Sequence, residues 1–232
     1  LVSVLSAMAQ QPEAAVASLP MLAPAVRTQV LAQSYGPHTD VAQRLLTQYP
    51  ESQSDALTVA SLFAAQAQRT PDARALAYAH EQGLTELSFA QLEAQSNQLA
   101  RALIARGVGA DQRVALLLRR SPQMVISMLA VLKAGAAYLP LDPEYPSARL
   151  AFMITDSGAS LVVSDAQLYA TLQGSVEQTL PPVLDLSDAK TQQELGAHPS
   201  GALHDQELLV ARELEHLAYI IYTSGSTGTP KG

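Results

Sequence analysis

Residues 113–141 read RVALLLRRSPQMVISMLAVLKAGAAYLPL, and this stretch decides the fold class. Its first part, 114–118, is a continuous apolar run, which is typical of a strand buried on both faces. Ser121 and Pro122 then predict a helix start, because serine caps free amides and proline suits the first helical position. That helix ends at a glycine, and 137–141 follows as a second strand. The stretch therefore predicts a strand–helix–strand unit of a parallel sheet.

Extended runs and helical patterns alternate on both sides of this unit. Ser88 lies three residues before Gln91, which predicts a capped helix, and Gly107 marks the end of that helix. Upstream, the pattern predicts a helix at 59–69 and extended segments at 75–78 and 86–87. Downstream, it predicts helices at 147–156, 166–172 and 188–195, and strands at 161–164, 183–186 and 217–222. The alternation indicates an α/β fold with a largely parallel sheet covered on both faces.

The first part of the chain does not follow this alternation. Residues 1–34 read as two short helices around a break at 18–20, and 34–56 is rich in turn-forming and polar residues. We therefore expect a short helical N-terminal appendage and a linker in front of the α/β part. The chain opens at Leu1 and stops at Gly232, and we expect both ends to be cuts in a longer protein.

Composition and charge restrict the class of protein. Hydrophobic residues make up 48% and charged residues 15% of the 232, which is typical of a globular protein rather than a disordered one. A net charge of −7 without a basic cluster argues against a nucleic-acid partner. No apolar run reaches the ~18 residues of a membrane helix, so no membrane partner is expected. The absence of cysteine fits a reducing compartment, and we expect a cytoplasmic protein without a metal site.

The end of the chain, 217–232, reads LAYIIYTSGSTGTPKG and carries the chemistry. An apolar strand leads into a loop of glycines and hydroxyl residues, where successive amides can converge on an anion. Lys231 adds a mobile positive charge suited to phosphate. The loop is not a Walker A motif, because that motif would need glycine at Pro230 and serine or threonine at Gly232. A flexible linker is the alternative interpretation of the loop considered alone.

The same sixteen-letter run resembles the signature of adenylate-forming enzymes, and specifically of the adenylation domains of nonribosomal peptide synthetases. LKAGAAYLPLDPEYP at 132–146 resembles the second core motif of that family. LSFAQL at 87–92 resembles the first, with Phe89 where tyrosine is usual. The resemblance implies that 59–232 is the N-terminal portion of an adenylation domain, truncated after the phosphate-binding loop, and forms part of the N-terminal subdomain of such an enzyme.

What the resemblance implies for chemistry is amino-acid activation. In that family a substrate carboxylate attacks the α-phosphate of ATP, pyrophosphate leaves, and the aminoacyl adenylate passes to a phosphopantetheine thiol on a carrier domain. The resemblance assigns the β- and γ-phosphates to Thr223, Ser224, Gly225, Ser226, Thr227, Gly228 and Lys231. It places the Mg²⁺ ligands and the remaining catalytic groups beyond Gly232. No catalytic or metal-ligating residue is therefore assigned, and the isolated chain is expected not to activate amino acids.

The amino-terminal residues carry a second resemblance. Residues 1–35 resemble the tail of a condensation domain, and 36–58 would be the interdomain linker. The expected partners are therefore the amino-acid substrate and the carrier and condensation domains of the same megaenzyme. Three alternatives stay open at this point: an acyl-CoA or fatty acyl-AMP ligase, a noncatalytic scaffold fragment, and a generic nucleotide-binding module.

Several other polar residues have simpler structural interpretations. Lys133 suits the last turn of a helix, where the helix dipole favours a cation. Asp142 and Glu144 lie between prolines and are expected to be turn residues rather than a metal pair. The three tyrosines near the predicted strands are expected to be strand and core residues: Tyr138, Tyr219 and Tyr222.

Overall fold

The computed structural model describes residues 58–81, 83–211, 215–223 and 231–232. The chain divides into two units, Leu1–Pro50 and Glu51–Gly232, and every described residue belongs to the second. The helices and the condensation-domain tail predicted in 1–35 lie outside the described residues, and so does the linker predicted at 36–58 except for its last residue, Thr58.

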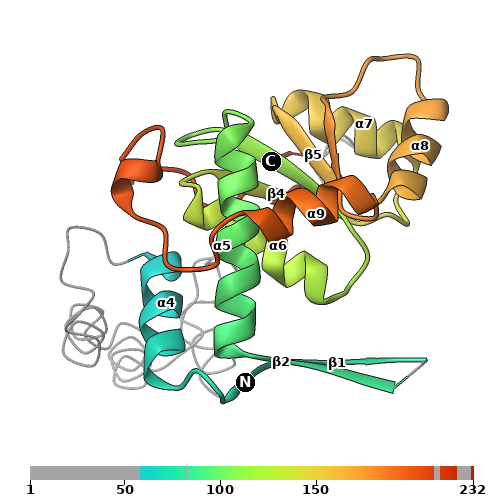
Figure 1. Cartoon of the computed structure of the whole chain (residues 1–232). Coiled ribbons are helices and arrows are strands. Elements are labelled where there is room, and N and C mark those ends of the chain that lie inside the picture. Colours follow the sequence, from blue (N-terminus) through green and yellow to red (C-terminus); the bar gives the residue numbers. More distant parts are fainter. Residues whose placement is uncertain (1–57, 82, 212–214, 224–230) are drawn as a thin grey trace, which may run out of the picture. The chain divides into compact units, whose positions relative to one another are not determined.

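Helices and strands alternate through the described part (Figure 1). The helices are α4 (Val59–Arg69), α5 (Phe89–Ala105), α6 (Pro122–Lys133), α7 (Ser147–Asp156), α8 (Ala166–Gly174) and α9 (Ala189–Ala197), with a 3₁₀ turn η3 (Asp205–Glu207). The strands are β1 (Arg74–His80), β2 (Gly83–Ser88), β3 (Arg113–Leu117), β4 (Ala137–Leu141), β5 (Leu161–Ser164) and β6 (Val183–Asp185). None of the helices in this part of the chain has the length and apolar character that a bilayer crossing requires.

Four of the strands form the parallel sheet that the sequence predicts, in the order β4-β3-β5-β6. Val114 of β3 pairs with Tyr138 of β4 on one side and with Leu161 of β5 on the other. β1 and β2 form a separate antiparallel pair. The α/β class and the parallel sheet are therefore confirmed.

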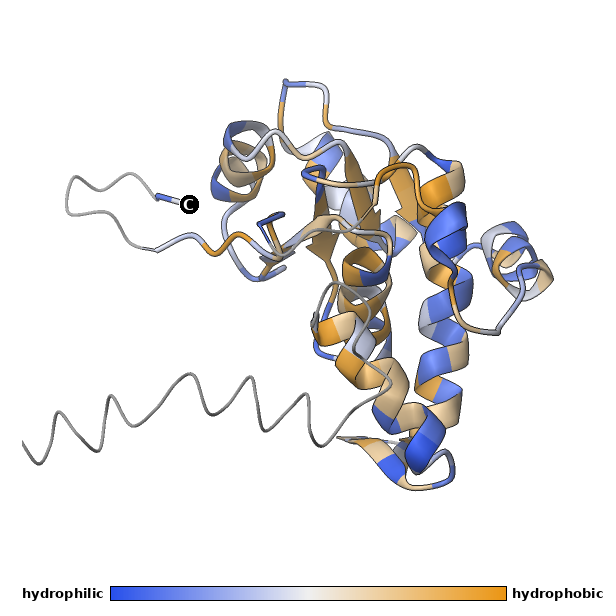
Figure 2. Ribbon diagram, turned by 90° about the vertical axis from the view of Figure 1, so that its left-hand side faces the viewer, coloured by the Kyte–Doolittle hydropathy of each residue, from blue (hydrophilic) through white to orange (hydrophobic). Residues whose placement is uncertain are grey.

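The two faces of the parallel sheet bury different helices. Even-numbered β3 residues such as Leu116 pack with α5 and α6, whereas odd-numbered ones such as Leu117 pack with α7. Because successive strand side chains point to opposite faces, an all-apolar strand such as β3 must be covered twice. Figure 2 shows the hydrophobic residues concentrated in the strands and the hydrophilic ones on the outer turns of the helices.

Helix ends follow the predicted capping residues closely. The Ser88 hydroxyl accepts a hydrogen bond from the Gln91 amide, and the Gln91 side chain accepts one from the Ser88 amide. At the start of α6 the Ser121 hydroxyl accepts a hydrogen bond from the Met124 amide, without the reciprocal bond. Gly107 and Gly135, which follow α5 and α6, have φ values of +84° and +83°, a conformation that favours glycine over other residues.

The run 217–222, predicted as a strand, forms only one bridge to β4. Tyr138 donates its amide to the Ala218 carbonyl and accepts from the Ile220 amide. The next backbone group on that edge belongs to Pro140, which has no N–H to donate. The ladder therefore stops after one residue pair, and the extended segment is not a full strand.

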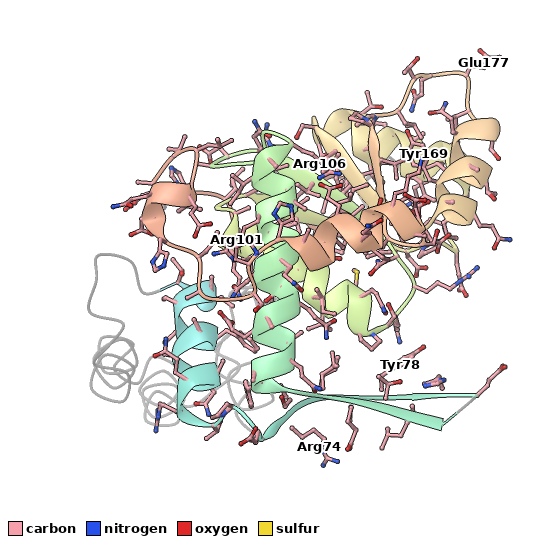
Figure 3. All side chains as sticks on the ribbon, viewed as in Figure 1. Arg74, Tyr78, Arg101, Arg106, Tyr169 and Glu177 are labelled. Atoms are coloured by element: carbon pink, nitrogen blue, oxygen red, sulfur yellow. The ribbon has the colours of Figure 1, made fainter. Side chains whose placement is uncertain are left out.

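Arg101 on α5 fixes the connection after α9 (Figure 3). Its five N–H groups donate to three backbone carbonyls, of Pro199, Gly201 and Ala202, and to both carboxylate oxygens of Glu207, at 2.7–3.0 Å. The Arg101 side chain is 9% exposed. We call this group the Arg101 clamp. The clamp holds residues 199–207 in place, a segment that has little regular secondary structure of its own.

The clamp predicts a pH dependence of stability. The hydrogen bonds from Arg101, and next the one from the His204 amide, lower the pKa of Glu207 from its ordinary value of 4.5 to about 2. Because the folded-state pKa is depressed, Glu207 stabilises the fold fully above pH 4.5 and loses this contribution as the pH falls towards 2. Thermal unfolding between pH 6 and pH 2 should show the midpoint difference between the unmodified protein and Glu207→Gln narrowing below pH 4.5. A constant difference would contradict the prediction.

Candidate phosphate-binding site

Two described residues bracket the predicted phosphate loop. Thr223 donates its amide to the Lys231 carbonyl at 2.9 Å and accepts from the Lys231 amide at 3.1 Å, an isolated antiparallel bridge. The pair brings together the two residues that flank the predicted loop, Thr223 and Lys231. We call Tyr222, Thr223, Lys231 and Gly232 the loop stem.

The stem is anchored in the core by Tyr222. Its hydroxyl donates to Oδ2 of Asp156, at the end of α7, with an oxygen–oxygen distance of 2.5 Å. Phe152 meets the Tyr222 ring edge-on at a centroid distance of 6.3 Å. The side chain is 9% exposed, and burial together with the Asp156 carboxylate raises the pKa of Tyr222. The hydroxyl therefore stays protonated, as a donor must.

Gly232 lies directly against this tyrosine. A Cβ at Gly232 would lie 2.7 Å from two ring carbons of Tyr222 and 3.0 Å from Cγ2 of Ile220. Real carbon contacts are not that short, so any larger residue would displace the ring or the backbone. Close packing against Tyr222 therefore explains why position 232 is a glycine.

Further contacts hold the segment that leads into the stem. Oδ1 of Asp111 accepts from the Leu217 amide at 3.3 Å, and Asp111 itself has a φ of 57°. The rings of Tyr138 and Tyr219 stack with centroids 5.8 Å apart. Sequence reasoning assigned Tyr138, Tyr219 and Tyr222 to strand and core, and this is wrong for Tyr219, which is 55% exposed. At an edge that pairs at one residue only, the outer face of the ring stays open to solvent.

Of the predicted phosphate ligands, the structure places Thr223 and Lys231. Lys231 is exposed, and its ammonium has no ion pair with a described residue. An exposed cation at the Thr223–Lys231 bridge fits a polyphosphate group in charge and access. Ser224, Gly225, Ser226, Thr227 and Gly228 lie outside the described residues, so their roles stay predictions.

Other polar candidates have structural roles. The Glu144 amide donates to Oδ1 of Asp142, a local turn contact, which confirms the turn interpretation. Lys133 has a structural role, as expected, but through partners that the sequence did not reveal. Its ammonium is buried and lies 2.7 Å from Oε2 of Glu93 on α5. In the described part of the chain, no three His, Asp or Glu residues gather as a metal site would need.

Sequence reasoning missed Asp111 and Asp156. Each contacts a residue 66 or more positions further along the chain. A lone Asp at the end of a helix or in a turn carries no sequence signal for such a partner. The one available signal is Tyr222 itself: a tyrosine in an apolar run is expected to be buried, and a buried hydroxyl requires a hydrogen-bond acceptor elsewhere in the fold.

Known proteins resemble the chain in both sequence and fold. The model of the AMP-binding enzyme family matches residues 63–232. Tyrocidine synthase 3 of Brevibacillus parabrevis is 45% identical over 175 residues, covering 75% of this chain and 2% of that protein. A linear gramicidin synthase polypeptide of the same organism is 40% identical over 230 residues, covering 99% and 4%. The chain thus spans a few per cent of the length of these curated relatives.

Solved structures give the same result. The N-terminal subdomain of Klebsiella oxytoca NpsA matches with a TM-score of 0.59 and 26% identity, over 75% of this chain and 40% of that one. The N-terminal domain of FACL13 from Mycobacterium tuberculosis matches with a TM-score of 0.62 and 25% identity, over 73% and 42%. The expected fold, part of the N-terminal subdomain of an adenylate-forming enzyme, is confirmed. Since the family model matches most of its residues, the chain belongs to the AMP-binding enzyme family.

Proposed function

We propose that residues 59–232 are the N-terminal portion of an adenylation domain that activates an amino acid with ATP. The observation that carries the proposal is the Thr223–Lys231 bridge, which closes a glycine- and hydroxyl-rich loop beside an exposed ammonium. Bound ATP would supply the α-phosphate that the amino-acid carboxylate attacks. The contribution of this chain is to hold the departing phosphates, through loop amides and hydroxyls and the Lys231 charge.

The assembly around this domain is also a proposal. Residues 1–35 would be the end of a condensation domain and 36–58 the linker. This is supported by alignments to two linear gramicidin synthase polypeptides, which cover 97% and 99% of the chain and so include this region. Carrier-bound phosphopantetheine would receive the aminoacyl group. A cytoplasmic location and Mg²⁺ ligands beyond Gly232 are part of the same proposal.

A second candidate activity is the activation of a carboxylic acid other than an amino acid, as in the acyl-CoA and fatty acyl-AMP ligases. It is favoured by the structural likeness to NpsA, one structure of which holds 3-hydroxybenzoyl-AMSN. That likeness has 25% identity, against 41% and 43% for two relatives named as a nonribosomal peptide synthetase and a dimodular nonribosomal peptide synthase. The difference favours the amino acid.

Replacing Lys231 by alanine tests the proposed role of the loop. In the complete adenylation domain that contains this chain, kcat/KM for ATP in amino-acid-dependent pyrophosphate exchange should fall about tenfold, the size expected for losing one hydrogen bond to a charged group. Lys190→Ala, which removes another exposed lysine, is the matched control and should leave the rate unchanged. Equal rates for the two variants would contradict the assignment of Lys231 to phosphate.

The isolated chain should not catalyse this exchange. The family resemblance places the ribose-binding and metal-binding groups after Gly232, so the 232-residue chain would hold phosphates without completing the site. Amino-acid-dependent exchange by the purified chain would overturn this expectation.

A further inference from the structure

We propose that Asp156 is a positioning residue for the phosphate loop: it fixes Tyr222, and through Tyr222 the backbone of Thr223 that pairs with Lys231. The inference rests on the proposed function of the loop and adds to it a residue outside the loop sequence. Asp156 contacts no predicted phosphate ligand among the described residues, so its action must pass through the tyrosine.

The contact between Asp156 and Tyr222 has the features of a strong anchor. A phenol hydroxyl that donates to a carboxylate makes a charge-assisted hydrogen bond, and 2.5 Å lies at the short end of that class. The Tyr222 ring is buried beside Phe152 and Ile220, so water competes little for the hydroxyl. The bond joins the last residue of α7 to the last residue before the stem bridge.

The backbone offers no equivalent anchor at this position. The segment 217–222 bonds to β4 only through Tyr138, because Pro140 cannot donate where the next ladder bond would form. Beyond the Ile220 amide, no described backbone group pairs the segment with the sheet before Thr223 meets Lys231. The tyrosine side chain therefore replaces the backbone ladder that holds an ordinary strand.

The position of the Tyr222 ring determines the backbone path of both strands of the stem, at Thr223 and at Gly232. Thr223 follows Tyr222 directly and makes both bridge hydrogen bonds with Lys231. Gly232 has no room for a Cβ against the ring, so the path of the chain after Lys231 also follows the ring. A shift of Tyr222 would move Thr223 and Lys231 together, and a displacement of about 1 Å in a binding group can cost up to about 100-fold in rate.

Steady-state kinetics of the complete adenylation domain test the proposal. Tyr222→Phe and Asp156→Ala should each raise KM for ATP by about three- to tenfold while KM for the amino acid stays constant, because the stem serves only the phosphates. Combining the two should cost no more than either alone, since they break one bond. Asp156→Asn keeps an oxygen acceptor and should restore most of the ATP affinity.

A matched control separates positioning from general destabilisation. Tyr169 on α8, labelled in Figure 3, donates its hydroxyl to the Pro181 carbonyl at 2.7 Å in a half-buried setting away from the stem. Tyr169→Phe should leave both KM values unchanged even if the unfolding midpoint falls. Equal changes in KM for ATP in Tyr169→Phe and Tyr222→Phe, or additive losses in the double variant, would overturn the proposal.

Hydrogen exchange gives a readout that needs no activity. Peptides covering 217–232 should exchange faster in Tyr222→Phe and Asp156→Ala than in the unmodified domain or in Tyr169→Phe, because the bridge amides of Thr223 and Lys231 lose protection. Unchanged exchange would overturn the positioning role. Faster exchange in a domain that never catalyses pyrophosphate exchange would instead uphold the positioning and refute the proposed activity.

Discussion

Replacing Lys133 by methionine is expected to destabilise the adenylation domain by about 3–5 kcal/mol, the usual cost of breaking a buried ion pair by removing one partner. The ammonium is almost fully buried between α6 and α5, within 2.7 Å of Glu93 Oε2 and Ser96 Oγ and 2.6 Å of Asn97 Oδ1. Methionine fills similar space but leaves the Glu93 carboxylate, 16% exposed, without its cation. Urea unfolding of the complete domain measures the loss.

Two further variants make the Lys133 prediction specific. Adding Glu93→Met to Lys133→Met removes both charges and should recover part of the stability, since the uncompensated carboxylate is gone. Arg106→Met breaks the pair with Glu194 on α9, whose side chains are 31% and 41% exposed, and should cost only about 0–1 kcal/mol. Similar losses for Lys133→Met and Arg106→Met would show that burial does not set the cost.

Replacing Arg101 by lysine is expected to cost about 2–4 kcal/mol, although the charge is kept. The guanidinium satisfies two carboxylate oxygens and three carbonyls at once, whereas an ammonium has three donors and no planar fork. At least two of these acceptors would lose their partner, each at about 1–3 kcal/mol less what water recovers. Thermal unfolding of the complete domain measures this change.

The control for Arg101 is Arg106, the residue that directly follows α5 (Figure 3). Arg106→Lys exchanges a bidentate contact with one exposed carboxylate for a single one, and should change stability by less than about 1 kcal/mol. Hydrogen exchange in 198–207 should rise in Arg101→Lys and not in Arg106→Lys. A lysine at 101 that leaves both stability and exchange unchanged would contradict the clamp.

The fold could be predicted from sequence where local signals decide it. Ser88 and Ser121 at helix starts, and Gly107 and Gly135 after helix ends, act on backbone groups within four residues, so a short stretch of sequence contains the whole interaction. The prediction of a full strand at 217–222 was wrong because strand formation also depends on the partner strand. The β propensity of 217–222 is a local property, but the N–H group that the ladder lacks is at Pro140, on β4.

The candidate site could be predicted only as a loop. Its hydroxyls, glycines and lysine are contiguous, which is why the amino-acid sequence alone supports the phosphate proposal. Lys133 shows the opposite case: its place at a helix end was read correctly, whereas its ion pair with Glu93 joins residues forty positions apart and depends on how α5 and α6 pack. Contacts of that separation follow from tertiary structure and leave no mark in a single sequence.

Pro140 also determines how firmly the backbone of the segment 217–222 is held at the sheet edge. A sheet usually resists local displacement because several backbone hydrogen bonds must break together. At this edge of β4 the described backbone contributes only the two bonds at Tyr138, about 1–3 kcal/mol in all, and the side-chain contacts of Asp111, Tyr219 and Tyr222 hold the segment in addition. Once the Tyr222–Asp156 bond is removed, the segment 217–222 should separate from this edge more readily than the four-stranded sheet opens. Under the proposed function, substitutions in the four-stranded sheet would mainly decide whether the domain forms, and substitutions at Asp156 and Tyr222 would mainly decide where the phosphates are held.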